Sequence, residues 1–372
     1  MPRLFGADWS RRDLCARVGD ISQVAGVSRM QYAEGPERGV DVLRFRTGSG
    51  LDFDVLPGRG LDIANATYQG QPLAWMSANG IPHSAYYEPE GLGWLRGFFG
   101  GLLTTCGMLT AGSPGEDPDA APMPAGAPTE LPGTVRLGLH GRLNQTPARA
   151  VSADGYWDGD DYLLCAQGRL RESIIFGENV ELLRRVQASA GEAKIRLVDE
   201  VTNHGFVSQP HMMLYHMNLG WPLLAPGARL VASVSDTEPR DADAAAGLAQ
   251  CRGFEPPAVA YPEQVFYHQA EPDDRGWCQV GIINPALGAG LGVGISYRAA
   301  ELDQLVQWKS MLAGTYVCGL EPANCRVGGR WAERAAGRLK VIEPGQTISY
   351  ALTIEVLDGA EACAAFESSA ER

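Results

Sequence analysis

Residues 315–324 of the chain read T-Y-V-C-G-L-E-P-A-N, an apolar run that ends in a carboxylate. The apolar part, 315–320, is typical of a buried strand rather than of a solvated helix face. Such a strand would carry Glu321 into a half-enclosed site, where burial raises the proton affinity of a carboxyl group. A general base at neutral pH needs that property, so Glu321 is the first candidate for chemistry. The alternative is a buried structural carboxylate that accepts hydrogen bonds from backbone amides.

Strand-like segments separated by turn signals extend over the rest of the chain. The pattern predicts an all-β fold, one large antiparallel β-sandwich in a single domain over residues 1–372. Segments 96–103 and 301–306 are interpreted as short helices. Residues 111–132 are rich in Ala, Pro and Gly and are interpreted as a surface loop. The expected strands are 40–46, 51–56, 161–170, 174–176, 180–187, 194–201, 209–217, 279–283, 290–297 and 348–356.

Composition excludes several classes of function. The 372 residues carry a net charge of −13, which argues against a nucleic-acid binder. No apolar run approaches the ~20 residues of a membrane-spanning helix, and the N-terminus lacks the apolar core of a secretory signal. The eight cysteines form no C-x-x-C pair, which indicates reduced thiols in a cytoplasmic protein without structural zinc. The sequence is compatible with a homo-oligomer.

Three further segments combine polar side chains with Gly, Pro or aromatic residues. They are 138–147 with His140 and Arg142, 215–222 with His216 and Asn218, and 56–63 with Arg59. Each has a structural alternative. Arg59 can form a structural ion pair with Asp62 at a hairpin. A lone histidine is more often a hydrogen-bonded core or surface residue than a catalyst. That reading is preferred for His83, His204, His211 and His268.

The order of these motifs resembles the galactose mutarotase (aldose 1-epimerase) superfamily. The motifs are H-G-R at 140–142, H-M-N-L-G-W-P at 216–222 and G-L-E-P-A-N at 319–324, together with P-G-R-G-L-D-I at 57–63 and Q-W-K at 307–309. The resemblance covers about 35–357 and is greatest to a poorly characterised aldose-1-epimerase-like branch. It implies a β-supersandwich with no required metal and no organic cofactor.

The resemblance also implies roles for single residues. Glu321 matches the general base that takes the proton of the anomeric hydroxyl, and His216 matches the general acid that protonates the ring oxygen. His140 matches a second histidine near that oxygen. The aspartate with which the family anchors sugar hydroxyls has no matching motif, and residues 264–268 occupy its interval. The substrate-binding candidates are Arg142, Arg59, Asn218, Lys309, Trp308 and Asn324, and Trp221 is a further candidate wall.

The expected substrate is a small-molecule sugar, neutral or anionic. If Arg59, Arg142 and Lys309 converge, they favour an anionic sugar, because arginine can bind a carboxylate or phosphate with two parallel hydrogen bonds. The leading hypothesis is a mutarotase or epimerase that opens the ring by acid–base catalysis. The alternatives are a keto-sugar isomerase with the same acid–base pair, a non-catalytic carbohydrate-binding protein, and a metal site formed by His140, His216 and Glu321.

Overall fold

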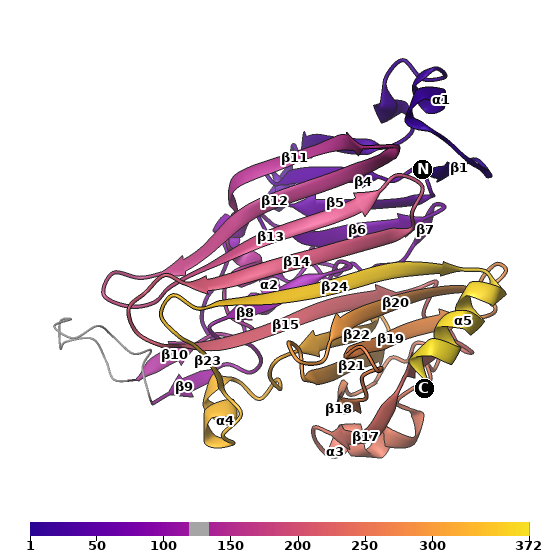
Figure 1. Cartoon of the computed structure of the whole chain (residues 1–372). Coiled ribbons are helices and arrows are strands. Elements are labelled where there is room, and N and C mark those ends of the chain that lie inside the picture. The colour runs from indigo at the N-terminus through magenta and orange to yellow at the C-terminus, as the bar shows by residue number, and fades with distance from the viewer. Residues whose placement is uncertain (119–133, 372) are drawn as a thin grey trace.

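The structure, a computed structural model, describes residues 1–118 and 134–371. Antiparallel strands dominate it, and they form two layers with a large apolar core between them (Figure 1). The expectation of a large antiparallel β-sandwich is confirmed.

The first layer is a sheet of eight strands in the order β11-β12-β13-β14-β24-β20-β19-β16. Its long strands alternate between buried and at least partly exposed residues, as expected for strands with one face on the core. Their bounds are β11 (Arg149–Asp158), β12 (Asp161–Ser173), β13 (Asn179–Ser189), β14 (Lys194–Asn203), β16 (Arg229–Ala232), β19 (Trp277–Asn284), β20 (Leu291–Arg298) and β24 (Thr347–Asp358).

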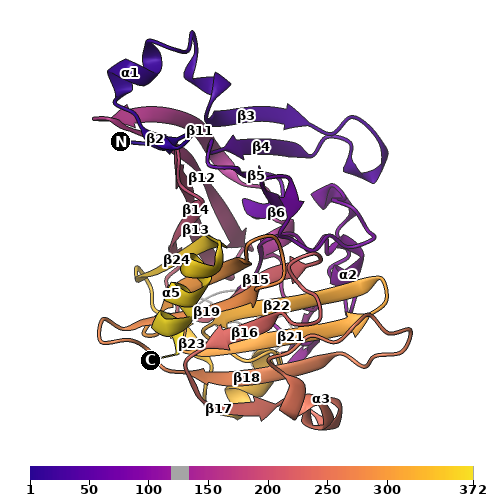
Figure 2. The ribbon, with the colours of Figure 1, turned by 90° about the vertical axis from the view of Figure 1, so that its right-hand side faces the viewer.

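The second layer consists of a seven-stranded and a five-stranded sheet (Figure 2). The seven-stranded sheet has the order β17-β18-β21-β22-β15-β23, and β8 also pairs with β15. The five-stranded sheet has the order β3-β4-β5-β6-β7, and a bridge between Ile63 and Leu103 links it to the segment before β8. The bounds are β3 (Gly26–Gln31), β4 (Asp41–Arg46), β5 (Leu51–Leu56), β6 (Asp62–Tyr68), β7 (Gln71–Pro72), β8 (Thr104–Met108), β15 (Gln209–Gly220), β17 (Val234–Pro239), β18 (Gln264–Ala270), β21 (Gln304–Leu312), β22 (Thr315–Ala323) and β23 (Lys340–Ile342).

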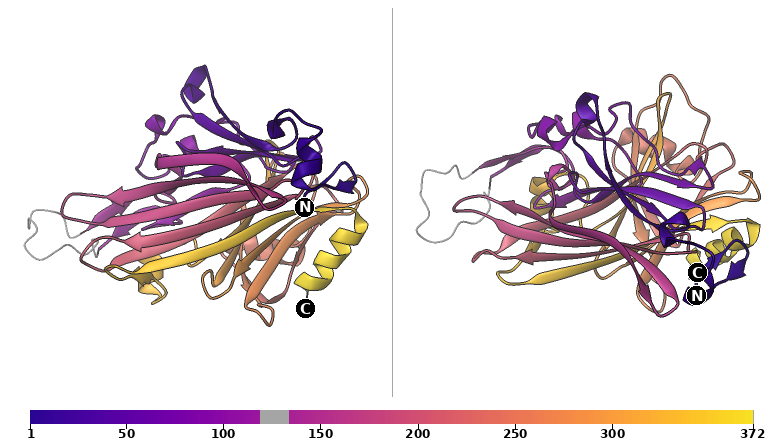
Figure 3. Two further views of the ribbon diagram at one scale, coloured as in Figure 1. Left: turned by 45° about the horizontal axis from the view of Figure 1, so that its top comes forward. Right: turned by 90° about the horizontal axis from the view of Figure 1, so that it is seen from above.

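Short elements complete the described residues. Two small hairpins are β1 (Arg3–Leu4) with β2 (Ala7–Asp8), and β9 (Gly115–Asp117) with β10 (Val135–Leu137). Both termini lie at one end of the sandwich, and the β9–β10 hairpin lies at the other (Figure 3). The α-helices are α1 (Arg11–Cys15), α2 (Trp94–Gly97), α3 (Ala242–Gly247), α4 (Arg330–Ala335) and α5 (Ala360–Ala370), and the 3₁₀ turns are Ile21–Gln23, Gly35–Glu37, Ser84–Tyr86, Leu143–Gln145 and Leu248–Gln250. No helix within the described ranges is long and apolar enough to cross a membrane.

Strand β15 is buried along its whole length because both of its faces are covered. Met213, Tyr215 and Met217 point into the core between the layers. Met212 and Leu214 belong to a second apolar cluster on the other face of the sheet. Side chains alternate along a strand, so His216 lies on the same face as this second cluster.

Three local expectations are wrong. Residues 174–176 form a turn at the tip of the β12–β13 hairpin, where chain reversal overrides the strand preference of Ile-Ile-Phe, and Phe176 has φ 66°. Residues 304–306 of the expected helix 301–306 belong to β21, which is paired on both sides. The helix expected over 96–103 ends at Gly97, and Gly100 and Gly101 then have positive φ values of 75° and 79°.

The expected surface loop 111–132 is wrong in its first part. Ala111 is fully buried, and residues 115–117 form β9. Residues 119–132 of that loop lie outside the described residues.

Candidate active site

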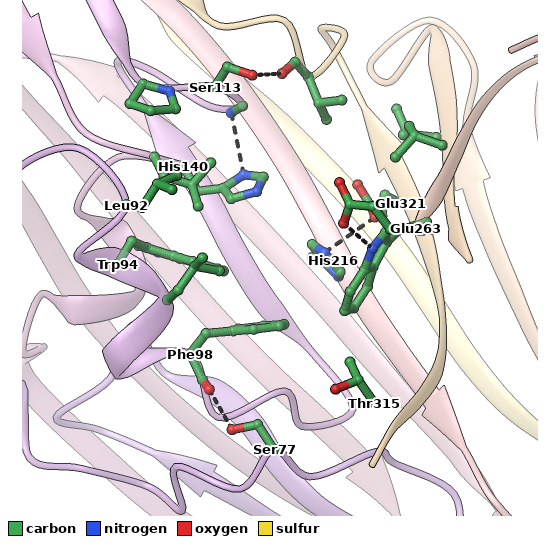
Figure 4. Close-up of a pocket in the computed structure, with 18 of the residues that line it drawn as sticks. Ser77, Leu92, Trp94, Phe98, Ser113, His140, His216, Glu263, Thr315 and Glu321 are labelled. Carbon is green, nitrogen blue, oxygen red and sulfur yellow. Dashed lines mark hydrogen bonds and ion pairs between the residues drawn. The ribbon is translucent and has the colours of Figure 1, made fainter. Parts of the chain in front are cut away.

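A cavity of about 580 Å³ opens on the face of the seven-stranded sheet that points away from the main core. Four sequence-predicted residues line it: His140, His216, Glu321 and Trp308. In Figure 4, His140, Trp94 and Phe98 stand on one side, and His216, Glu321 and Glu263 stand on the other. A volume of this size is within the range of small-molecule sites.

His216 and Glu321 are cross-strand neighbours. The register of β15 and β22 pairs Leu214 with Ala323 and Met217 with Leu320, which places His216 directly opposite Glu321. The Nε2 atom of His216 lies 3.3 Å from Oε1 of Glu321. Both residues are almost inaccessible, with exposed fractions of 5% and 2%. The two groups therefore contact each other on one wall of the cavity and do not face each other across it.

Burial shifts the proton affinities of this pair in opposite directions. Burial, with the nearby carboxylate of Glu263 as a smaller cause, raises the pKa of Glu321 to about 8. Burial also lowers the pKa of His216 to about 3, with His140 as a further cause. Both shifts favour the uncharged forms, so at neutral pH the pair holds one proton, and this proton resides mainly on Glu321. The Nδ1 atom of His216 is buried and has no hydrogen-bond partner within the described residues.

His140 is held by a tight turn on the opposite wall. Its φ of 57° is in the left-handed region, which is uncommon for a residue with a side chain. Its backbone N–H donates to the Gly112 carbonyl at 2.8 Å, and the Gly112 N–H donates to Nδ1 of the ring at 3.3 Å. Because Nδ1 accepts, the neutral ring carries its proton on Nε2. Burial lowers the pKa of His140 to about 4, so the ring is neutral at pH 7.

Aromatic rings form much of the cavity wall. Trp94 stacks on Phe98 with ring centroids 4.6 Å apart and contacts the His140 ring at 4.7 Å. The Trp308 ring lies edge-on to His216 at 5.5 Å. Such surfaces suit the apolar faces of a sugar ring.

Gly319 keeps the space in front of the acid–base pair open. It lies on the same face of β22 as Glu321, since the two are two residues apart. A methyl group in place of its hydrogen would lie 2.7 Å from Oε1 of Glu321 and 2.9 Å from Cε1 of His216. The glycine of the G-L-E motif thus has a steric role in the site.

Two charged cavity residues were missed by sequence reasoning. Arg240 and Glu263 line the opening, and Nη2 of Arg240 lies 3.1 Å from Oε1 of Glu263. Trp308 donates from Nε1 to Oε2 of Glu263 at 3.0 Å. Glu263 directly precedes β18 (Gln264–Ala270). It therefore adjoins residues 264–268, where the anchoring aspartate of the family was sought, and this carboxylate was a signal in the sequence. Nothing local predicts that Arg240, beyond the end of β17, lies beside it.

The three cations whose convergence would favour an anionic ligand do not line this cavity. Arg59 is fully buried, and its guanidinium donates to the carbonyls of Asn144, Pro82 and Gly97. Lys309 is also fully buried and faces away from the cavity, because it is the neighbour of Trp308 on β21. Its Nζ lies 2.7 Å from Glu255. Arg142 is exposed and lies outside the cavity lining.

The two asparagines support the strands that carry the pair. The Asn218 amide donates to the carbonyls of Gly101 and His216, and Asn324 Oδ1 accepts the N–H of Met213 at 2.7 Å. Neither lines the cavity. Trp221, expected as a cavity wall, is instead 69% exposed and lies outside the lining.

The described residues do not support the alternative of a metal site formed by His140, His216 and Glu321. Within residues 1–118 and 134–371, no set of three His, Cys, Asp or Glu side chains is placed to hold a metal ion.

Comparison with solved structures identifies the class of the fold. A protein of Klebsiella pneumoniae subsp. pneumoniae MGH 78578, named a "putative aldose 1-epimerase", has a TM-score of 0.83 and 26% identity, over 92% of this chain and 86% of that chain. A galactose mutarotase-like protein from Clostridium acetobutylicum has a TM-score of 0.58 and 12% identity, over 89% of this chain and 98% of that chain. A galactose 1-epimerase from Lactobacillus acidophilus NCFM has a TM-score of 0.55 and 10% identity, over 90% and 99%. The fold is that of the galactose mutarotase-like sandwiches, which confirms the resemblance.

The family itself follows from the sequence. The model of the family described as "Domain of unknown function (DUF4432)" matches residues 37–356, and the chain belongs to that family. No curated protein matches the sequence at a significant level.

Proposed function

We propose that the protein is a mutarotase that interconverts the anomers of a free sugar by acid–base ring opening. The observation that carries the proposal is the buried pair Glu321–His216, which shares an aromatic-walled cavity with His140. A binding protein has no need for a carboxylate and an imidazole in direct contact, whereas ring opening needs one group that accepts a proton and one that donates it. The similarity to a "putative aldose 1-epimerase" at 26% identity agrees with this reaction class.

The proton balance of the reaction suits a pair that holds one proton. Transfer of that proton from Glu321 to His216 over 3.3 Å gives a carboxylate and an imidazolium. The carboxylate then takes the proton of the anomeric hydroxyl while the imidazolium protonates the ring oxygen. The C1–O bond of the ring breaks, and the aldehyde forms. Both oxygens are bonded to the same carbon, so two groups on one wall can reach them.

His140 contributes a fixed hydrogen-bond donor in this proposal. With Nδ1 engaged by Gly112, its Nε2–H is free to donate to an oxygen of the substrate. After rotation about the C1–C2 bond, the same steps in reverse close the ring on the other face. No net proton is gained or lost, and no cofactor enters any step.

The test is NMR exchange spectroscopy on a panel of reducing sugars. Enhanced anomer exchange in the wild type and its loss in Glu321→Gln are expected, with a loss of about 10²–10⁴-fold. The matched control is Glu172→Gln, because burial raises the pKa of Glu172 to about 7 as well, but Glu172 does not line the cavity. Equal exchange in wild type and Glu321→Gln contradicts the proposal. Solvent deuterium on a sugar carbon would instead indicate a keto-sugar isomerase, because ring opening moves only O–H protons.

A further inference from the structure

The side-chain amide of Asn218 is held in one orientation by the backbone around it. Asn218 follows His216 by two residues on β15, so the two side chains lie on the same face of the strand. Its Nδ2 donates to the carbonyl of Gly101 at 3.1 Å and to the carbonyl of His216 at 3.0 Å. Only the nitrogen of an amide can donate to a carbonyl, so these two contacts fix which end of the amide is Nδ2 and which is Oδ1.

Asn218 and His216 each carry a buried polar atom that lacks a partner. Oδ1 of Asn218 accepts no hydrogen bond within the described residues, and Nδ1 of His216 has no partner there either. Buried polar atoms in proteins are nearly always paired, so both atoms need an explanation. They are complementary, because an amide oxygen accepts hydrogen bonds and an imidazole N–H donates them.

The Asn218 side chain is close enough to affect the titration of the His216 ring. Burial, with His140 as a further cause, lowers the pKa of His216 to about 3. The Asn218 side chain and then the carbonyl of His216 itself act in the opposite direction and raise this pKa. That direction is the one expected for a group that accepts a hydrogen bond from the ring.

The contact with Glu321 decides which ring nitrogen of His216 carries the proton. Glu321 is mainly a neutral carboxylic acid at pH 7. Its O–H can donate to Nε2 of His216, 3.3 Å from Oε1, only if Nε2 is unprotonated (Figure 4). A neutral imidazole has one N–H, so in this arrangement the proton of the ring is on Nδ1. There it points into buried surroundings and needs an acceptor.

We propose that Asn218 is a positioning residue: its Oδ1 accepts the N–H at Nδ1 of His216 and so keeps Nε2 free to take the proton of Glu321. The backbone orients the amide, and the amide selects the tautomer of the ring. When Nε2 takes the proton, the bond from Nδ1 becomes charge-assisted and stabilises the imidazolium. The catalytic consequence rests on the proposed function, but the tautomer is a property of the free protein.

The first experiment measures this tautomer in the wild type without ligand. The ¹⁵N chemical shifts of the imidazole nitrogens at pH 7 distinguish a protonated from an unprotonated nitrogen. The variant His216→Gln identifies the signals of His216 among the six histidines. We expect a protonated Nδ1 and an unprotonated Nε2. This measurement does not depend on whether any variant of Asn218 folds.

Two variants of Asn218 then separate the acceptor from the donor. Asn218→Leu removes both, so the ring proton should move to Nε2, and anomer exchange should fall about 10- to 100-fold. Asn218→Asp removes the donations to Gly101 and His216 but keeps a side-chain oxygen. It should therefore keep the proton on Nδ1 and exchange anomers faster than Asn218→Leu does.

Asn324→Leu is the matched control for the loss of a buried amide. Oδ1 of Asn324 accepts the N–H of Met213 on the same strand β15, and its Nδ2 lies 3.3 Å from the hydroxyl of Tyr350. This variant should lower the stability of the protein but leave the proton of His216 on Nδ1.

Three results overturn the inference. They are a proton on Nε2 of His216 in the wild type, an unchanged tautomer in Asn218→Leu, and equal loss of exchange in Asn218→Leu and Asn218→Asp. The last result would mean that Asn218 acts only through its donations to the backbone. A failure of the mutarotase proposal is distinct from these results, because it shows as absent anomer exchange in the wild type, whereas the tautomer is measured without a sugar.

Discussion

Oε1 of Glu321 lies 3.3 Å from Nε2 of His216, and the two residues occupy directly opposed positions on paired strands. Both groups are almost inaccessible to water, so neither gains from ionising alone. Their titration therefore belongs to the pair, which takes up a first proton near pH 8 and a second near pH 3.

The first prediction is an alkaline limit of activity. If the singly protonated pair is the active form, kcat/KM for anomer exchange is constant at neutral pH and falls as the pH rises through about 8. The sign follows because above this pKa the pair has lost its only proton and cannot protonate the ring oxygen. Exchange spectroscopy over a pH series, corrected for the buffer rate, measures this alkaline limb of the pH–rate profile.

Glu263→Gln should move the same limb to lower pH. The charge of Glu263 helps to raise the pKa of Glu321, so its removal makes Glu321 easier to ionise. Asp241→Asn, which removes a negative charge beside Arg240 but outside the cavity lining, should leave the limb in place. A rate that instead increases up to pH 8 would show that Glu321 acts alone as a base, and the single-proton pair would be wrong.

The second prediction concerns Gly319→Ala. The added methyl group would lie 2.7 Å from Oε1 of Glu321 and 3.2 Å from Cβ of Trp308, so the side chains of the site must move. The backbone of Gly319 has no positive φ, so alanine is compatible with the strand itself. Since a displacement of ~1 Å can cost about 100-fold in rate, we expect a loss of that order with an unchanged circular dichroism spectrum.

The control for this substitution is Gly253→Ala. There the added methyl group meets no atom closer than 3.9 Å, and the anomer exchange rate should equal that of the wild type. A Gly319→Ala variant with the full rate would mean that the geometry of the Glu321–His216 pair does not limit the reaction.

Much of the fold was predictable because its signals are local. Alternating apolar residues and Gly- or Pro-containing turns give the hairpin of β4 and β5 and most of the long strands. The errors at 174–176 and 301–306 have a common cause. In both places the local preference of a few residues is overridden by the position of a chain reversal or by pairing with two neighbouring strands.

The site was predictable only where a motif marks it. Glu321 was found at the end of an apolar strand, His216 and His140 in segments that combine polar side chains with Gly, Pro or aromatic residues, and the structure brings all three together. Trp308 and Lys309 were both candidates for the site, but only Trp308 lines the cavity, because adjacent residues of a strand point to opposite faces. Glu263 and Arg240 come from separate connections, and only the tertiary fold brings them to one opening.

The third prediction tests whether Arg59 stabilises the fold or binds a ligand. Arg59→Met removes the donor of three buried carbonyls, those of Asn144, Pro82 and Gly97. The Gly97 carbonyl keeps the side-chain amide of Gln145 as a donor at 3.5 Å, so two carbonyls are left unsatisfied. Each unsatisfied carbonyl costs about 1–3 kcal/mol, so a loss of at least about 2 kcal/mol in the free energy of unfolding is expected. Urea unfolding measures it. Arg142→Met is the exposed counterpart and should change stability by less than about 0.5 kcal/mol.

Neither of these arginine variants should change the preference between neutral and anionic sugars. A selective loss of uronate binding in Arg59→Met, with unchanged stability, would restore the hypothesis of an anionic ligand at Arg59.

The fourth prediction uses a buried histidine outside the cavity. The Nε2 atom of His211 lies 2.6 Å from the hydroxyl of Tyr350, and Nδ1 lies 3.2 Å from the Met108 carbonyl. Burial lowers the pKa of His211 from 6.5 to about 4. A depressed pKa in the folded state means that the stabilising contribution is present above pH 6.5 and is lost as the pH falls toward 4, since only the unfolded chain takes up the proton.

Between pH 7 and pH 5, this single group should reduce the free energy of unfolding of the wild type by about 2 kcal/mol. His211→Gln lacks this component, so its stability should fall less over the same interval. Tyr350→Phe is the matched control: it removes the hydroxyl partner but leaves His211 buried and neutral, so it should lower stability at both pH values by a similar amount. Parallel pH dependences of wild type and His211→Gln would show that His211 is protonated equally in the folded and unfolded states.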